Sequence, residues 1–234
     1  MYDLTDPLHV DLTARFPVPS RKGNQYLLVS IWHGLIHFEA MPSRAATSYI
    51  QAYTNIIAFF RNLGRCPSII RLDNETSDKL EAYLRAEKVD FQYVPPGTHR
   101  ANKAERAIRT GKNHVISILC GAHADFPLNL WDEILAQAEI TLSHLMPYTL
   151  DPTKCAYDGF HAQRYDFIAH PIAPVGTLVI VHEKPAQRGS WAPHGVKGYY
   201  LGPAVKHYHC WRTWILATQS ERLTDTVEWF PEPL

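Results

Sequence analysis

The sequence predicts an α/β domain, built on a mixed sheet with helices on its faces, followed by a small all-β barrel. Three observations support this prediction. Apolar segments of strand length alternate with segments of helical periodicity over residues 1–146. Residues 147–174 are rich in Pro, Tyr and His and have weak periodicity, which indicates an irregular connection. Short β-rich segments separated by turn signals then fill residues 175–234, which is typical of a small barrel.

The composition is that of a globular chain with balanced charge. Apolar residues make up 46% of it, which is ample for real cores, and 23 basic residues face 23 acidic ones. Proteins that bind nucleic acid through many phosphate contacts usually have a basic excess, so any nucleic-acid surface must be local. The four cysteines form no C-x-x-C pair, which favours neither a disulfide framework nor a zinc finger. Without a signal-peptide pattern or a bilayer-spanning apolar run, we expect an intracellular protein with no membrane partner.

The first half of the chain predicts an antiparallel start followed by helical crossovers. Strand-like segments cover residues 8–16, 26–32 and 35–41, with short turns between them. A helix with apolar residues at three- and four-residue spacing follows, with Ser43 as its predicted N-cap and Gly64 at its end. Such a helix provides the crossover that a parallel strand pair requires.

The remaining elements of the first domain follow in the same alternation. Ser77 or Asp78 can cap a short helix. The predicted strands are residues 68–73 and 89–94, and the predicted helices include residues 101–119 and 126–146.

Three acids stand on predicted rigid elements. Asp11 lies within the first strand, where an unpaired acid would be costly to bury. Asp73 ends a buried strand, and Glu105 lies near the start of the long helix. Because Mg²⁺ takes oxygen ligands in near-octahedral geometry, these carboxylates indicate a divalent-metal site.

Each acid also has a simpler interpretation. Asp73 could be a helix N-cap or a turn residue. Glu105 could form only a surface ion pair with Arg109 at i,i+4, worth about 0.3–0.5 kcal/mol. For Asp11, the strand could shift by a register, because the acids Asp3 and Asp6 lie nearby. We expect Asp3 and Asp6 to be solvated or turn residues.

Four motifs occur in an order that resembles one family. They are D-N-E at residues 73–75, N-K-A-E-R-A-I-R-T at 102–110, F-P-L-N-L-W-D-E-I-L-A-Q-A at 126–138 and G-V-K-G-Y-Y-L-G-P at 195–203. They resemble D-N-G, N-G-x-x-E-R-x-I-R-T, the W-x-E-A helix and G-x-F-L-G-Y of the copia-like retrotransposon integrases, which are part of a Pol polyprotein. The resemblance covers nearly the whole chain, from residue 10 to about residue 231.

The resemblance implies a ribonuclease-H-like catalytic core and a carboxy-terminal SH3-like barrel used for DNA contacts and assembly. It implies that Asp11, Asp73 and Glu105 are the Asp-Asp-Glu catalytic residues and hold two Mg²⁺ or Mn²⁺ ions. The activity would be DNA 3′-end processing and strand transfer of element DNA into target DNA, in the nucleus, by a homo-oligomer. Residues near Glu105 would contact DNA phosphates, to which Arg forks and Lys point charges are suited. These residues are Asn102, Arg106, Arg109 and Lys112.

Several departures from the family pattern leave an alternative open. Glu75 and Lys103 stand where the family usually has flexible glycines, and the interval between Asp73 and Glu105 is somewhat shorter than usual. The amino-terminal His-His-Cys-Cys module of integrases does not precede Asp11 in this sequence, so either the sequence is a fragment of a polyprotein or the element has lost that part. The chain could therefore be a catalytically inactive remnant that binds DNA or protein partners, or, less in keeping with the barrel motifs, a host nuclease of the same fold.

Two features of the carboxy-terminal region allow more than one interpretation. His207, His209 and Cys210 resemble a metal-binding tract, but no second ligand pair stands at zinc spacing. The barrel aromatics and their neighbours could either form the core or contact DNA. They are Trp191, Trp211, Arg212 and Trp214.

Overall fold

The computed structural model describes residues 6–72, 77–94, 103–161, 163–184 and 188–230. The chain divides into two compact units. The first unit consists of Met1–Asn113 and Glu139–Arg164, and the second consists of His114–Ala138 and Tyr165–Leu234. The predicted site residues Asp73 and Asn102 lie outside the described residues.

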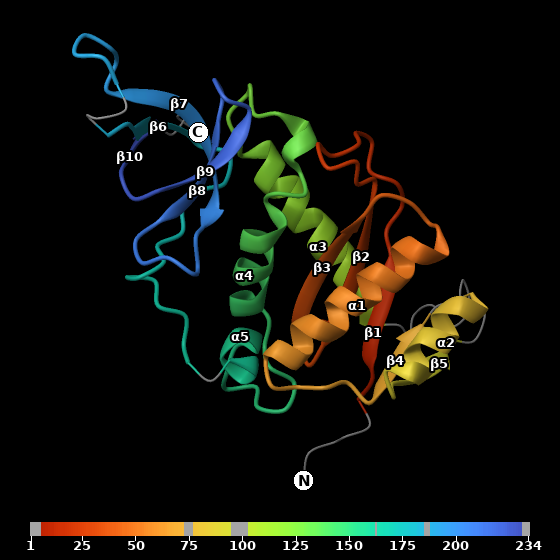
Figure 1. Cartoon of the computed structure of the whole chain (residues 1–234). Helices are drawn as coiled ribbons and strands as arrows, with labels where there is room; N and C mark the ends of the chain where they lie inside the picture. Colours follow the sequence, from red (N-terminus) through yellow and green to blue (C-terminus); the bar gives the residue numbers. More distant parts are fainter. Residues whose placement is uncertain (1–5, 73–76, 95–102, 162, 185–187, 231–234) are drawn as a thin grey trace. The chain divides into compact units, whose positions relative to one another are not determined.

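The first unit contains a five-stranded mixed sheet, as predicted (Figure 1). Its strands lie in the order β3-β2-β1-β4-β5. Strands β1, β2 and β3 pair antiparallel, whereas β1 and β4, and β4 and β5, pair parallel. The first strand is shorter than residues 8–16. The bounds are β1 Leu8–Leu12, β2 Tyr26–Trp32, β3 Leu35–Met41, β4 Ile69–Leu72 and β5 Asp90–Tyr93.

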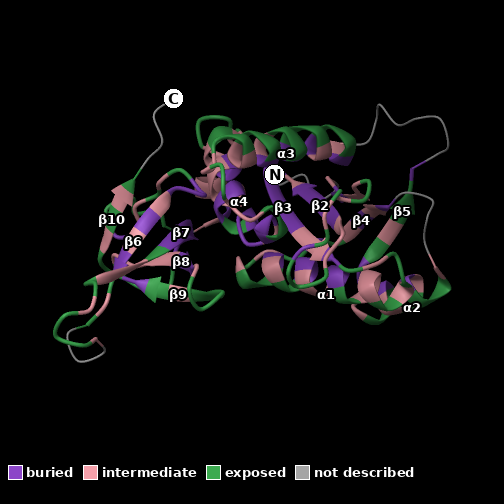
Figure 2. Cartoon of the chain, turned by 90° about the horizontal axis from the view of Figure 1, so that it is seen from above, coloured by how far each residue is buried: buried purple, intermediate pink, exposed green. Residues whose placement is uncertain are grey.

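Helices cover both faces of this sheet (Figure 2). Helices α1 (Ala46–Asn62) and α2 (Asp78–Ala86) lie on one face, and α3 (Lys103–Cys120) lies on the other. Helices α4 (Leu135–Leu145) and α5 (Ala156–Phe160) complete the helical elements. Among the described residues, no helix has the length and apolar character needed to cross a lipid bilayer.

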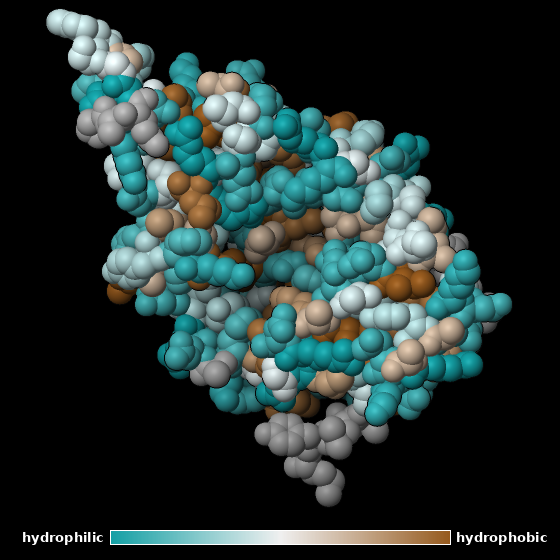
Figure 3. Space-filling model, in the orientation of Figure 1, coloured by the Kyte–Doolittle hydropathy of each residue, from teal (hydrophilic) through white to brown (hydrophobic). Residues whose placement is uncertain are grey.

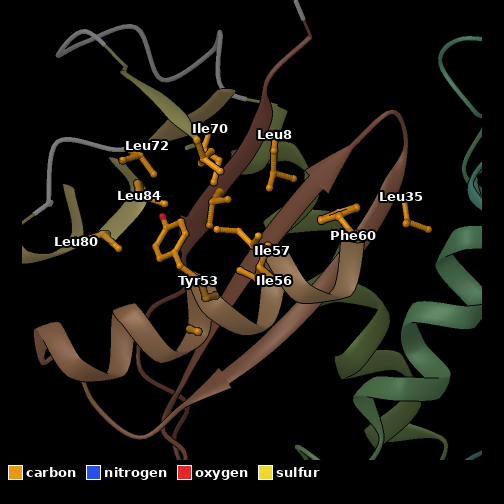
Figure 4. Close-up of a cluster of buried hydrophobic side chains, with 14 of the residues drawn as sticks. Leu8, Leu35, Tyr53, Ile56, Ile57, Phe60, Ile70, Leu72, Leu80 and Leu84 are labelled. Carbon is orange, nitrogen blue, oxygen red and sulfur yellow. The ribbon is translucent and has the colours of Figure 1, made fainter. Parts of the chain in front are cut away.

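The main hydrophobic core of the first unit lies between the sheet and helices α1 and α2 (Figure 4). Side chains from alternate strand positions meet the apolar stripes of these helices, as the helical spacing predicts. The labelled core residues in Figure 4 are Leu8, Leu35, Tyr53, Ile56, Ile57, Phe60, Ile70, Leu72, Leu80 and Leu84.

The predicted helix ends are only partly confirmed. The N-cap of α1 is Ala45, without a side-chain cap, so the prediction of Ser43 was wrong. The Ser43 hydroxyl instead accepts a hydrogen bond from the Ala45 amide two residues later, which forms a local turn ahead of the helix. Gly64 follows the end of α1 with a φ of +71°, and Ser77 caps α2 through its side chain, as predicted.

The second unit contains a five-stranded antiparallel sheet in the order β10-β6-β7-β8-β9. Strand β10, the last in the chain, pairs with β6, the first strand of this sheet in the chain, which is the pairing that a small barrel needs. Strand β9 was not predicted, because S-E-R-L-T has little apolar alternation. The bounds are β6 Leu178–His182, β7 Gly195–Pro203, β8 Trp211–Ile215, β9 Ser220–Thr224 and β10 Val227–Phe230.

The predicted helix over residues 126–146 is divided. A short 3-10 helix, η2 (Leu128–Leu130), precedes a turn, and α4 begins only at Leu135. Apolar spacing could not locate this break, because Leu130, Trp131 and Ile134 are buried on both sides of it.

Candidate active site

Asp11 points toward the sheet face that α3 covers. Leu8 and Val10 belong to the core on the α1 and α2 side, and side chains alternate along a strand. Asp11 therefore projects from the opposite face. It is partly buried, and its Oδ1 accepts a hydrogen bond of 2.8 Å from the Leu12 amide.

Helix α3 packs against one end of the row of residues that contains Asp11. Asp11 pairs with Val29 and Val29 pairs with Phe38, so these three positions form one row across three strands. Gly111 of α3 lies over the Phe38 end of this row, since a Cβ on Gly111 would come within 2.6 Å of the Phe38 ring. A residue without a side chain thus lets α3 approach the sheet closely.

The first half of α3 has a buried face of small residues and an exposed face of charged ones. The buried residues are Ala104, Ala107 and Gly111, and the exposed ones are Glu105, Arg106, Arg109 and Lys112. At about 100° per residue, Glu105, Arg109 and Lys112 lie within about 60° of one another around the helix. Arg106 lies about 100° from Glu105, toward the other flank. The predicted stripe beside Glu105 therefore comprises Arg109 and Lys112.

The strand that precedes Asp73 in the sequence lies beside the strand of Asp11. Strands β1 and β4 are parallel neighbours, with Leu8 opposite Ile70 and His9 opposite Arg71. Their carboxyl ends therefore lie at the same edge of the sheet, where open α/β sheets commonly bind ligands. Asp73 follows Leu72, the last residue of β4, and is itself outside the described residues.

The donor atoms of this site fit a hard divalent cation. Asp11 and Glu105 offer carboxylate oxygens, the ligands that Mg²⁺ and Mn²⁺ accept. In the described part of the chain, no group of three or more His, Cys, Asp and Glu side chains is arranged to hold a metal ion. That part includes His207, His209 and Cys210 but not Asp73.

A charged cluster surrounds Lys103, which stands two positions before Glu105, and was not predicted from the sequence. Lys103 Nζ donates a hydrogen bond of 2.7 Å to Asp6 Oδ1, and Asp6 Oδ2 lies 3.3 Å from His33 Nδ1. Only 18% of the Asp6 side chain is exposed and the residue lies in no turn, so the expectation that Asp6 is a solvated or turn acid was wrong. Because Asp6 and Lys103 are 97 positions apart, no local pattern links them.

A second buried charge cluster lies on the α1 side of the sheet. His37 Nδ1 lies 2.9 Å from Glu139 Oε1, and His37 Nε2 lies 3.7 Å from Glu39 Oε2. The imidazole stacks on the Phe59 ring at a centroid distance of 4.0 Å. Burial lowers the pKa of His37, but Glu139 and Glu39 outweigh burial and raise it to about 9.

In the second unit, the residues proposed as core or DNA contacts range from buried to fully exposed, and Trp211 and Arg212 are partly buried. Trp214 is buried, which confirms the core interpretation for this residue. Arg212 is held by ion pairs to Glu221 at 2.8 Å and to Glu133 at 2.9 Å. Trp191 is 99% exposed. On the molecular face in Figure 3, hydrophilic side chains dominate and hydrophobic ones form separate patches.

Comparisons with known proteins show the fold. No protein-family model and no curated protein matches the chain. A chain from the cryo-EM structure of the simian T-cell lymphotropic virus intasome in complex with PP2A regulatory subunit B56 gamma matches at a TM-score of 0.53. The match has 16% sequence identity and covers 97% of this chain and 79% of that chain.

Two catalytic core domains give weaker matches, each at a TM-score of 0.48. The BIV integrase core is 14% identical, with 65% of this chain and 91% of that chain covered. The HTLV-2 integrase core, solved with magnesium, is 18% identical, with 67% and 94% covered. The chain described here has an integrase-like fold, a ribonuclease-H-like sheet followed by an antiparallel β domain.

Proposed function

We propose that this chain is a DNA integrase of the Asp-Asp-Glu type, which trims DNA 3′ ends and joins them to target DNA. The observation that carries the proposal is the placement of the acids. Asp11 projects from the sheet face that α3 covers, and Glu105 lies exposed in the first turn of α3. The four ordered motifs support an origin in the Pol polyprotein of a copia-like retrotransposon.

In this proposal, Asp11, Asp73 and Glu105 hold two Mg²⁺ or Mn²⁺ ions. Such ions supply activation of the attacking oxygen and neutralisation of charge on the leaving oxygen. Asp11 lies on β1 and Glu105 on α3, while Asp73 follows β4 in the sequence. Strands β1 and β4 are adjacent and parallel.

The residues proposed to orient DNA lie on α3 or directly before it in the sequence. Arg109 and Lys112 are exposed on the flank of α3 that carries Glu105, which favours contacts with phosphates near the reacting bond. Asn102 precedes the helix in the sequence, and Arg106 is exposed toward the other flank. Because the formal net charge of the chain is zero, this local stripe must provide much of the attraction to DNA.

Assembly is part of the proposal. The simian viral chain belongs to an intasome. We expect this chain, too, to act as a homo-oligomer on the two ends of its element DNA, in the nucleus at the integration step.

A joining assay tests the proposed activity. Purified protein is mixed with duplexes that carry the element ends, a target plasmid, and Mg²⁺ or Mn²⁺. We expect metal-dependent joining that Glu105→Gln abolishes while DNA affinity stays within about twofold of wild type, because a ligand rather than a phosphate contact is lost. Asp90→Asn, which changes an exposed acid on β5, is the matched control.

The outcomes separate the two candidate functions. Undiminished joining by Glu105→Gln would refute the assigned site. If the wild-type protein binds the duplexes but joins none with either metal, the inactive DNA-binding remnant is the correct alternative.

A further inference from the structure

We infer that the ion pair between Lys103 and Asp6 is a positioning device, which fastens the first turn of α3 to the segment that leads into β1. The inference deepens the proposed function and rests on it, because the two elements so joined carry Glu105 and Asp11. Lys103 is the first residue of α3 and stands two positions before Glu105. Asp6 stands two positions before β1, the strand of Asp11.

Asp6 is held on three sides and is therefore a fixed attachment point. Its carbonyl oxygen accepts a hydrogen bond of 2.9 Å from Trp32 Nε1. Its two carboxylate oxygens face Lys103 Nζ at 2.7 Å and His33 Nδ1 at 3.3 Å. Both its backbone and its side chain are thus tied to the β2–β3 turn, which belongs to the same sheet as β1.

The turn that holds Asp6 is itself rigidly packed. His33 is buried, stacks on Trp32 at a centroid distance of 5.3 Å and contacts the Tyr148 ring edge-on at 6.0 Å. Gly34 follows with a φ of +93°, and a Cβ there would lie 2.2 Å from the carbonyl oxygen of Pro147. A salt bridge to such a preorganised partner loses less side-chain entropy than one between two mobile side chains.

The pair constrains α3 at the end where Glu105 lies. Ala104 and Ala107 are buried in the first two turns, and Gly111 packs against Phe38 eight positions after Lys103. Small side chains like these bury little surface, so the ion pair adds a directed polar contact at the first residue of the helix. Lys103 thereby acts on the site through the backbone of α3.

Hydrogen exchange on the metal-free protein tests the pair without reference to activity. In a helix, the amides of residues 107–110 donate to the carbonyls of residues 103–106, so their exchange reports opening of the first turn. We expect Lys103→Ala and Asp6→Asn each to accelerate exchange of these amides about fivefold, the effect of losing one favourable, partly buried pair. The double variant Lys103→Ala with Asp6→Asn should exchange no faster than the faster of the two single variants, because both single changes remove the same pair.

Controls separate this effect from general destabilisation. Lys154→Ala removes another Lys–Asp pair of the first unit, at 3.2 Å from Asp151, and should leave exchange of residues 107–110 unchanged. Lys103→Arg, which keeps the charge, should exchange as wild type does. Wild-type exchange in Lys103→Ala, or accelerations of the two single variants that multiply in the double variant, would overturn the inference.

Activity then reports the consequence for the site. Lys103→Ala should lower kcat for joining about tenfold at an unchanged KM for DNA, and should weaken Mn²⁺ binding measured by electron paramagnetic resonance. A raised KM with an unchanged kcat would instead make Lys103 a DNA contact and refute a positioning role. A wild-type protein that joins no DNA would refute the proposed function, while the exchange data would still decide the role of the pair.

Discussion

Raising the pH from about 6.5 to about 9 is expected to destabilise the first unit, because His37 is protonated in the folded protein. Its imidazolium lies between Glu139, 2.9 Å away, and Glu39, 3.7 Å away, and it stacks on Phe59. Asn55 donates a hydrogen bond of 2.6 Å to Glu39 and fixes that carboxylate. The cluster is buried, so loss of the positive charge leaves two carboxylates poorly solvated.

The magnitude follows from the difference in pKa between the folded and unfolded chain. The pKa of His37 rises from 6.5 to about 9 on folding, although burial alone would lower it. Because the folded pKa is the higher one, the stabilisation is fully present below pH 6.5 and is lost as the pH rises through 9. At 1.36 kcal/mol for each pKa unit, the loss in unfolding free energy across this interval is roughly 3 kcal/mol.

Urea unfolding at a series of pH values measures this loss. The unfolding free energy of wild type should fall between pH 6.5 and 9 relative to that of His37→Gln, which cannot carry the charge. The His37 ring resonances should titrate near pH 9 in nuclear magnetic resonance spectra. His194→Gln, at an exposed histidine, should keep the wild-type pH profile. Parallel profiles for wild type and His37→Gln, or a His37 ring that titrates near 6.5, would refute the argument.

Two further substitutions test packing in the two units. Tyr200→Phe removes a buried hydroxyl that donates a hydrogen bond of 2.8 Å to Gln137, so unfolding of the second unit should be easier by about 1–3 kcal/mol in urea. Gly34→Ala should lower the unfolding free energy of the first unit by about 2–5 kcal/mol, because it combines a φ of +93° with contact to the Pro147 carbonyl. Gly23→Ala, at a φ of +84° with open space around it, should cost less, and equal costs would refute the role of the contact.

The mixed sheet could be predicted because its strands and helices differ in period. Apolar residues alternate with polar ones in β1, follow one another in much of β2, and recur every three or four positions in α1. These patterns can be recognised in the sequence without knowledge of the fold. The same reasoning missed β9, whose sequence S-E-R-L-T is mostly exposed at the sheet edge. It also misplaced the N-cap of α1, because the Ser43 hydroxyl serves a local turn.

The elements that carry two of the candidate residues could be predicted from local sequence. Asp11 lies in the predicted first strand and Glu105 in the predicted long helix, while their role as metal ligands remains a prediction from the resemblance. The partners of Lys103 and of His37 come from elements about a hundred positions away, Asp6 in one case and Glu139 in the other. Contacts between residues so far apart in the sequence depend on the fold. It brings the start of α3 beside Asp6, and it brings α4 beside β3.

The structure changes the significance of one departure from the family pattern. A lysine beside Glu105 would weaken a metal site if its charge competed for the same carboxylate. Lys103 and Glu105 are two positions apart, about 160° around the helix, and side chains with this spacing do not face each other. The Lys103 ammonium is bound to Asp6 at 2.7 Å. The substitution of lysine for glycine therefore adds an attachment for α3 and leaves Glu105, Arg109 and Lys112 together on another flank of the helix.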